Sequence, residues 1–154
     1  MADLKEGDPA PAFESVDQDG KKISLEEFRG KRVVLYFYPK DDTPGCTAEA
    51  CNLRDNYNTF LSQGFEVLGV SADSERSHQK FIGKYKLPFR LVSDMDRKVL
   101  EAYGAWGEKK MYGKSYMGIL RKTFGIGTDG IVEKIFEKVN TKEHSQQIFE
   151  ELSH

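Results

Sequence analysis

Residues 33–38 form a continuous run of β-branched and aromatic side chains, Val-Val-Leu-Tyr-Phe-Tyr. A short apolar run of this kind, preceded by polar residues and ended by Pro39, predicts a strand buried on both faces of an α/β sheet. After a turn, apolar residues recur at intervals of three and four from Cys46 to Ser62, which predicts a helix that stops before Gly64. The pattern indicates an α/β fold class and places a cysteine where a strand passes into a helix.

The rest of the chain predicts further strands and helices. In order, we expect a β-hairpin over 12–25 with its turn at 17–20, one helical turn, a strand over 65–72, a helix over 74–85, a strand over 89–93, a helix over 96–103, a loop over 104–118, paired strands over 119–127 and 130–138, and a helix over 141–152. This order predicts a mixed central sheet with helices on both faces. In such sheets reactive groups gather where strand ends meet helix starts, as the turn before the first cysteine does.

Length and composition limit the domain count and the partners. With 154 residues, 38% hydrophobic and 31% charged, we expect residues 1–154 to form one domain. The 23 Lys and Arg against 25 Asp and Glu provide no basic field that would gather nucleic acid or an anionic membrane surface. The N-terminus is polar and no later stretch approaches membrane-spanning length, so we expect a cytoplasmic protein.

Cys46 and Cys51 are the only cysteines in the chain. A sulfur in the first turn of a helix faces unpaired backbone N–H groups and the positive end of the helix dipole, and both favour the thiolate. In a reducing cytoplasm a disulfide is more often transient and catalytic than structural. We therefore interpret the pair as redox-active rather than as two small buried residues that lie close by chance.

The charges close to the first cysteine oppose a thiolate. Three carboxylates, Asp41, Asp42 and Glu49, lie near it in the sequence. Arg54 lies about two turns along the helix, too far to reach the sulfur. We therefore expect a compensating cation from a distant part of the sequence.

The spacing of the two cysteines is unusual for a dithiol pair. Residues five apart in an α-helix have Cα atoms about 8–9 Å apart, whereas a disulfide needs about 4.4–6.8 Å. Cys46 and Cys51 cannot bond while both stay helical. The spacing favours a mechanism in which Cys46 reacts first and alone, and Cys51 joins it only after oxidation and local unwinding.

The motif Pro39-x-x-x-Thr43-x-x-Cys46 matches the active-site motif of the peroxiredoxins. The longer segment 36–51, Tyr-Phe-Tyr-Pro-Lys-Asp-Asp-Thr-Pro-Gly-Cys-Thr-Ala-Glu-Ala-Cys, resembles the bacterioferritin comigratory protein class, also called peroxiredoxin Q. Further matches lie at 7–13, 17–20, 70–73, 91–94, 103–108 and 118–124. The resemblance therefore spans nearly the full chain.

This resemblance implies a thioredoxin-like fold, a three-layer α/β/α arrangement with a mixed central sheet and an N-terminal β-hairpin. It implies that Cys46 is the peroxidatic cysteine, Cys51 the resolving cysteine and Arg121 the distant cation. Thr43 would hydrogen-bond the thiolate or a peroxide oxygen, and Pro39 would shield the sulfur. No metal and no cofactor is expected, and the protein is expected to be a monomer or a weak homodimer.

The implied reaction is that of an atypical two-cysteine peroxiredoxin. Attack on hydrogen peroxide or an organic hydroperoxide gives a sulfenic acid on Cys46, which condenses with Cys51 to an intramolecular disulfide. Thioredoxin or a similar dithiol donor would then reduce the disulfide. The chain departs from many relatives after the matching arginine, where they continue Thr-Phe-Leu-Ile-Asp and this chain has glycine at Gly125 and Gly127, which predicts a less rigid strand.

The histidines give no metal-site pattern. His78, His144 and His154 are scattered, without a Cys–His or His–carboxylate cluster at ligand spacing, so we expect solvated helix or tail positions. For Glu49 the sequence leaves two readings open, since it could orient groups near the first cysteine or only favour the helix N-terminus.

The loop over 104–118 contains Trp106, Met111, Tyr112 and Tyr116. We favour packing of these side chains within the protein over recognition of a partner. The segment 125–130, which superficially resembles a phosphate loop, lies between two predicted strands and is expected to be a hairpin turn.

Two other function classes remain from the sequence alone. One is a thioredoxin-like disulfide oxidoreductase acting on protein thiols, which the five-residue spacing of the cysteines disfavours. The other is a non-enzymatic binding or holdase module, which the set Thr43, Cys46 and Arg121 disfavours. Loss of hydrogen peroxide in the presence of the reduced protein would separate both from a peroxidase.

Overall fold

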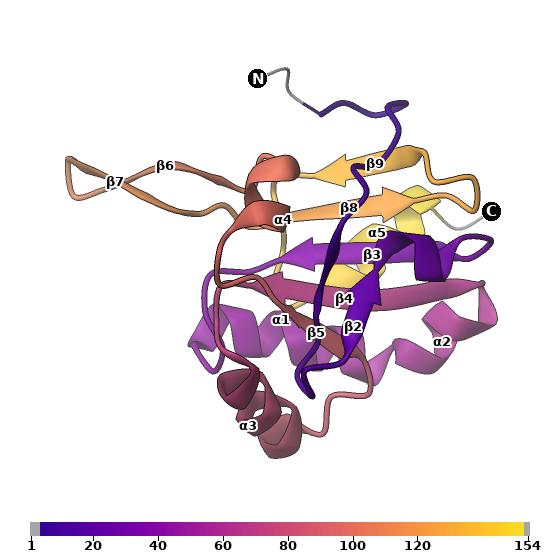
Figure 1. The fold of residues 1–154 in the computed structure, drawn as a ribbon, viewed down its shortest axis with the longest axis horizontal. Helices are drawn as coiled ribbons and strands as arrows, with labels where there is room; N and C mark the ends of the chain where they lie inside the picture. Colours follow the sequence, from indigo (N-terminus) through magenta and orange to yellow (C-terminus); the bar gives the residue numbers. More distant parts are fainter. Residues whose placement is uncertain (1–3, 153–154) are drawn as a thin grey trace.

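The structure, a computed structural model, describes residues 4–152. Its centre is a seven-stranded sheet in the order β2-β1-β5-β4-β3-β8-β9 (Figure 1). The strands are β1 (Glu14–Val16), β2 (Lys22–Ser24), β3 (Arg32–Phe37), β4 (Phe65–Ser71), β5 (Arg90–Ser93), β8 (Lys122–Ile126) and β9 (Val132–Phe136). The three central strands are parallel, and β1, β8 and β9 add antiparallel pairings. The predicted mixed sheet and N-terminal hairpin are confirmed.

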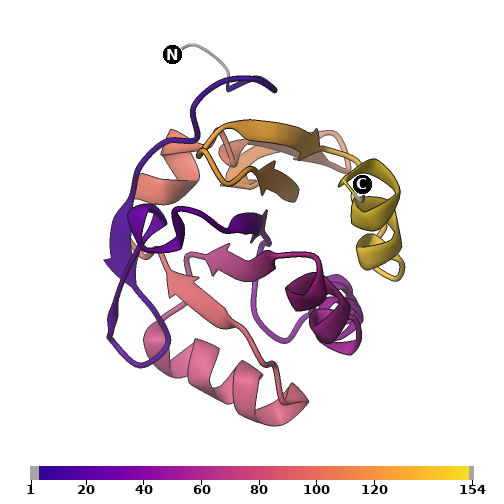
Figure 2. The same ribbon diagram turned by 90° about the vertical axis from the view of Figure 1, so that its right-hand side faces the viewer.

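Helices cover both faces of this sheet (Figure 2). They are the 3₁₀ helix η1 (Leu25–Phe28) and the α-helices α1 (Pro44–Asp55), α2 (Tyr57–Ser62), α3 (Glu75–Tyr85), α4 (Lys98–Ala102) and α5 (His144–Leu152). Buried side chains of α1, α2, α3 and α5 share one core cluster, and those of η1 and α4 share the other. Between residues 4 and 152, no helix combines the length and the apolar character needed to cross a membrane.

Strand β3 lies between the two cores. Val33, Leu35 and Phe37 point into the cluster shared with α4, while Val34 and Tyr36 point into the cluster shared with α1. All five side chains are buried because successive residues of a strand face opposite sides of the sheet. The predicted strand with two buried faces is therefore confirmed.

The predicted helix over 46–62 is instead two helices. α1 begins two residues earlier, at Pro44, because proline suits the first helical position, where its missing N–H is not needed. α1 ends at Asp55, and the backbone of the next residue, Asn56 (φ −108°, ψ 10°), leaves the helical region. The Asn56 side chain donates to the Asn52 carbonyl at 2.8 Å and so takes the acceptor that a continuing helix would use.

The predicted loop over 104–118 is wrong, because this segment is a hairpin. β6 (Trp106–Met111) and β7 (Lys114–Ile119) pair as a separate two-stranded sheet that projects from the body of the molecule (Figure 1). The two turn residues, Tyr112 and Gly113, have φ values of 54° and 78°, as a tight hairpin turn requires. The Tyr-Gly pair at 112–113, between two short strand-like segments, could have indicated the hairpin, although tyrosine is an uncommon first residue of such a turn.

Gly125 has a packing role within β8. It is buried and paired with Val34 and Lys134, and a Cβ atom at this position would lie 2.4 Å from Cδ1 of Leu152. The missing side chain therefore lets α5 approach the sheet closely. The segment after it, 127–130, forms the predicted turn, with the Gly130 N–H donating to the Gly127 carbonyl at 2.9 Å.

Candidate active site

Cys46 lies in the first turn of α1, on the turn that leaves strand β3. Thr43 precedes the helix with extended backbone (φ −103°, ψ 157°), and Pro44 occupies the first turn. The Cys46 side chain is buried, with 1% of its surface exposed. Cys46 thus lies in the first turn of a twelve-residue helix, where backbone N–H groups lack intrahelical partners and the end of the helix dipole is positive.

Arg121, just before β8, reaches the cysteine from far along the chain. Its Nη2 lies 3.3 Å from the Cys46 Sγ, and its Nη1 donates to Oε1 of Glu49 at 2.6 Å. A Cβ atom at Gly45 would lie 3.2 Å from Nη2, so glycine there leaves room for the guanidinium. A distant cation, which the local charges required, is therefore in contact with the sulfur.

The three nearby carboxylates each have a partner. Burial raises the pKa of Glu49 to about 7, against the opposing effect of Arg121. Hydrogen bonds from Lys84 and then Tyr85 lower the pKa of Asp42, which is exposed. Asp41 accepts hydrogen bonds from the Tyr38 and Ser77 hydroxyls in a buried network. Of the three, only Glu49 lies against the cation that contacts the sulfur.

The other predicted site residues surround the same turn. The Thr43 hydroxyl donates to the Lys40 carbonyl at 2.9 Å, which leaves its oxygen lone pairs free to accept a further hydrogen bond. Pro39 is half-buried at the end of β3. Cys51 is half-buried, and both cysteines are free thiols on one uninterrupted helix, α1. The structure thus brings Arg121 to Cys46 and leaves Cys51 on the same helix without a bond.

The expectation of solvated histidines is wrong for two of the three, and His154 lies outside the described residues. His144 is fully buried, and burial lowers its pKa to about 4. Its Nδ1–H donates to Gln147 at 2.9 Å, and its Nε2 accepts from the Thr123 hydroxyl at 2.8 Å. A neutral imidazole satisfies both bonds, so its 3.6 Å contact with Oε2 of Glu49 is not an ion pair.

Glu49 Oε2 has no hydrogen-bond partner among residues 4–152, although it is buried. The other carboxylate oxygen is held by Arg121, and the neutral His144 ring offers no proton to this one. An unsatisfied buried oxygen favours the protonated carboxyl, in agreement with the raised pKa of Glu49. Of the two readings left open by the sequence, the structure therefore favours a role beside the cysteine.

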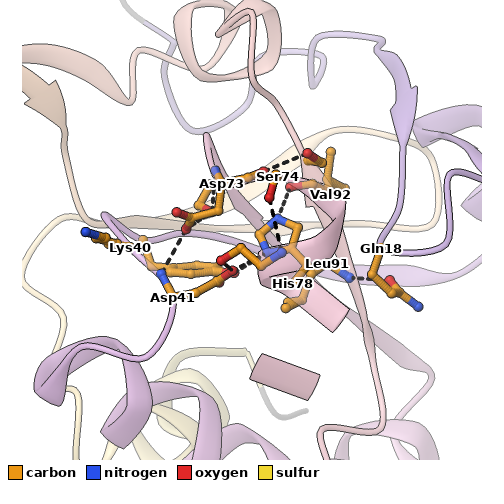
Figure 3. A network of polar contacts seen from close by, with 12 residues as sticks. Gln18, Lys40, Asp41, Asp73, Ser74, His78, Leu91 and Val92 are labelled. Atoms are coloured by element: carbon orange, nitrogen blue, oxygen red, sulfur yellow. Dashed lines mark hydrogen bonds and ion pairs between the residues drawn. The ribbon is translucent and has the colours of Figure 1, made fainter. Parts of the chain in front are cut away.

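His78 is fully buried and belongs to a network of polar contacts that includes Asp41, in the same turn (Figure 3). Asp41 accepts from the hydroxyls of Tyr38 at 2.6 Å and Ser77 at 2.8 Å, and its Oδ2 lies 2.7 Å from the His78 Nδ1. The backbone N–H of Asp41 donates to Asp73 at 2.8 Å. The network anchors the turn between β3 and α1 to the start of α3.

Asp41, Asp73 and His78 could offer metal-ligand atoms within 4.8 Å of one another. The donor set does not fit an ion well, because Asp41 Oδ2 and His78 Nδ1 already share a hydrogen bond at 2.7 Å and His78 Nε2 bonds the Val92 carbonyl. Helical periodicity could have revealed both buried histidines. His78 shares a face of α3 with Phe81, and His144 shares a face of α5 with Ile148 and Leu152.

Comparison with known proteins shows the family of this chain. Residues 6–135 match the AhpC/TSA family. Peroxiredoxin Bcp from Escherichia coli is 47% identical over 94% of this chain and 92% of its own length. This chain belongs to the AhpC/TSA family, within the Bcp group of peroxiredoxins.

Solved peroxiredoxin structures confirm the predicted thioredoxin-like fold. A cysteine mutant of peroxiredoxin Q from Xylella fastidiosa superposes with a TM-score of 0.91 at 31% identity, covering 99% of this chain and 97% of that one. The bacterioferritin comigratory protein of Xanthomonas campestris, in a study of its alkyl peroxide reduction, gives a TM-score of 0.87 at 36% identity, covering 97% and 96%. This peroxiredoxin is thus a thiol-dependent peroxidase that reduces peroxides with thiol reductants.

Proposed function

We propose that this peroxiredoxin reduces hydrogen peroxide and organic hydroperoxides through a sulfenic acid on Cys46, which Cys51 resolves to an intramolecular disulfide. The observation that carries the proposal is the 3.3 Å contact between Arg121 Nη2 and the Cys46 Sγ in the first turn of α1. No other cation contacts either sulfur among the described hydrogen bonds. The relative from Xanthomonas campestris, studied for alkyl peroxide reduction, supports the organic substrates.

The first step makes one bond and breaks one. The Cys46 thiolate attacks the terminal oxygen of the hydroperoxide, so that an S–O bond forms while the O–O bond breaks and an alkoxide or hydroxide leaves and is protonated. Arg121 stabilises the thiolate and the charge that develops on the oxygens. Thr43, whose hydroxyl oxygen keeps free lone pairs, accepts a hydrogen bond from the peroxide, and Pro39 limits water at the sulfur.

The second step needs a change of backbone conformation. The Cys51 thiolate attacks the sulfenic sulfur, an S–S bond forms and hydroxide leaves, so the step releases water after proton transfer. Because α1 runs unbroken from Pro44 to Asp55, the two Cα atoms lie about 8–9 Å apart by helix geometry and the helix must open between them.

A dithiol protein of the thioredoxin type returns both cysteines to thiols. The chain works as one domain over residues 1–154, as a monomer or a weak homodimer, and without nucleic acid or membrane partners, as its near-neutral charge suggests. We place the protein in the cytoplasm, where a reducing environment suits a transient catalytic disulfide.

Two cysteine variants test the assigned roles. Cys46→Ser should abolish peroxide reduction, while Cys51→Ser should complete one turnover and leave a sulfenic acid that dimedone traps. Intact-mass measurement after one equivalent of peroxide reads both results. Equal loss of the first turnover in the two variants would contradict the assignment, and a steady rate in Cys51→Ser with dithiol reductant equal to wild type would remove Cys51 from the cycle.

A further inference from the structure

The His78 ring joins the turn before α1 to strand β5 through its two nitrogens. His78 Nε2 lies 3.0 Å from the Val92 carbonyl oxygen, which only accepts, so Nε2 carries a hydrogen. Nδ1 of the same ring lies 2.7 Å from Oδ2 of Asp41. Both ring nitrogens of His78 are therefore held by the fold, one by the Val92 carbonyl and the other by the Asp41 carboxyl group.

Two hydroxyls and a second carboxylate face this pair. Tyr38, at the end of β3, and Ser77, on α3, donate their hydroxyls to the two oxygens of Asp41. Asp73, before α3, offers a carboxylate oxygen within 4.8 Å of the pair, and its Oδ2 accepts from the Asp41 backbone N–H and from the Ser71 hydroxyl. The Asp41 carboxylate is 4% exposed and His78 is 0% exposed, so water competes little for these bonds.

Asp41 is in turn close to the reacting cysteine along the chain. Asp42, the next residue, has left-handed backbone with φ 57°, and Thr43 follows as the residue before α1. A left-handed aspartate is strained and persists when its neighbours are held. The bonds to Asp41 hold the turn immediately before that residue, and so set the direction in which Thr43 and the first turn of α1 leave the sheet.

We propose that His78 is a positioning residue for the peroxidase reaction. Its contact with Asp41 fixes the turn between β3 and α1, and thereby the geometry of Thr43 and the Cys46 sulfur toward the peroxide. His78 touches neither the sulfur nor Arg121 among its described contacts, so it acts through Asp41. The role rests on the proposed oxidation of Cys46. Oxidation of the parent Cys51→Ser protein tests that reaction independently of His78.

The test compares two reactions of the same sulfur in a Cys51→Ser background. Oxidation by hydrogen peroxide depends on the precise arrangement of Thr43, the sulfur and Arg121, whereas alkylation by iodoacetamide depends chiefly on the thiolate and its access. His78→Leu removes both ring contacts, and His78→Asn keeps one donor toward Asp41. Phe28→Leu, on the opposite core, serves as a destabilised control that does not touch the turn.

We expect His78→Leu to slow sulfenic acid formation by about 10- to 100-fold per folded molecule, the range for small misplacements of reacting groups. His78→Asn should recover part of the rate. The rate of alkylation in both histidine variants should stay near that of the Cys51→Ser parent. Phe28→Leu should form sulfenic acid at the parent's rate once its unfolded fraction is subtracted.

Three results would overturn the role of His78. The first is that both histidine variants form sulfenic acid at the rate of the Cys51→Ser parent. The second is that the rates of oxidation and alkylation fall by the same factor in His78→Leu. The third is that Phe28→Leu slows oxidation per folded molecule as much as His78→Leu does. If the Cys51→Ser parent itself forms no sulfenic acid, the proposed function fails as well, and this outcome is seen before any histidine variant is made.

Discussion

At the scale of single residues, the guanidinium of Arg121 is shared between a sulfur and a carboxylate. Nη2 contacts the Cys46 Sγ at 3.3 Å and Nη1 binds Glu49 at 2.6 Å. The planar fork of arginine allows both contacts from one side chain, and a lysine ammonium, as a point charge, does not reproduce them. The charge and the geometry of this residue are therefore separable by mutation.

Arg121→Ala should slow sulfenic acid formation by about 10²- to 10³-fold, the usual cost of removing one preorganised charge-stabilising donor. Arg121→Lys should give an intermediate rate, because it keeps the charge and loses the fork. Rapid-mixing measurement of peroxide loss under single-turnover conditions checks this, with Arg29→Ala, an exposed arginine paired with Glu26, as the matched control. A normal rate in Arg121→Ala would refute its role in the chemistry.

Glu49 and His144 give opposite contributions to the pH dependence of stability. The pKa of Glu49 is about 7 in the folded chain against an ordinary 4.5, so the folded state holds a proton that the unfolded state releases, and stability falls as pH rises through this window. The pKa of His144 is about 4 against 6.5, so the unfolded state binds a proton that the folded state does not, and stability rises with pH.

The two effects should offset each other between pH 4.5 and 6.5, the overlap of their windows. Glu49→Gln should therefore make the free energy of unfolding rise more steeply with pH there, by up to about 1.4 kcal/mol per pH unit. Urea unfolding of the reduced protein at several pH values measures the slope. Glu150→Gln, at an exposed position of α5, is the control, and an unchanged slope in Glu49→Gln would show that Glu49 is ionised in the folded state.

At the scale of elements, the break at Asn56 separates two helices that the apolar pattern of 46–62 joins. The pattern was right about the buried face, since Leu53 and Phe60 both enter one core. It could not reveal the break, because the break depends on one side-chain hydrogen bond to the Asn52 carbonyl. A polar residue within an apolar repeat has several possible partners, and the sequence does not say which one it finds.

The break at Asn56 should limit the unwinding that accompanies disulfide formation to α1. Forming a Cys46–Cys51 disulfide requires part of α1 to unwind, because the two Cα atoms must approach by about 2–4 Å. We expect amide hydrogen exchange to accelerate within α1 on oxidation and to change little in α2 and β4. Exchange with mass spectrometry on the dithiol and disulfide forms checks this, and Cys51→Ser treated with peroxide controls for oxidation alone. Unchanged protection of α1 in the disulfide form would contradict the geometry.

The hairpin of β6 and β7 was the element that sequence patterns missed. Met111, Tyr112, Tyr116 and Met117 are exposed, between 43% and 97%, so their apolar character marked neither a core strand nor a buried loop. Trp106 is the exception, because it packs against the main core, and Arg97 lies 4.6 Å over its ring. The sequence predicted that Trp106, Met111, Tyr112 and Tyr116 pack within the protein. This prediction is correct for Trp106 and wrong for the other three.

At the scale of the whole molecule, local patterns predicted the elements, and tertiary contacts decided the site. The buried run of β3 and the cysteine after it could be read directly, because periodicity and turn residues are local. The partners of Asp41 could not be predicted from local patterns, because His78 lies 37 residues away in the sequence and α3 brings it to Asp41. The charge argument required a distant cation, and only the motif resemblance named Arg121.

The close approach of Leu152 to Gly125 has a consequence for how such chains diverge. Because a Cβ atom at 125 would lie 2.4 Å from the leucine, the two positions should change together, with a larger residue on the strand accompanied by a smaller one on α5. Gly125→Ala alone should cost about 1–3 kcal/mol of stability by overpacking. The cost should shrink in a Leu152→Ala background, and additive effects in this double-mutant cycle would show the sites to be independent. Relatives with leucine at the strand position should therefore carry a shorter side chain opposite it, a paired substitution that selection would retain as a unit.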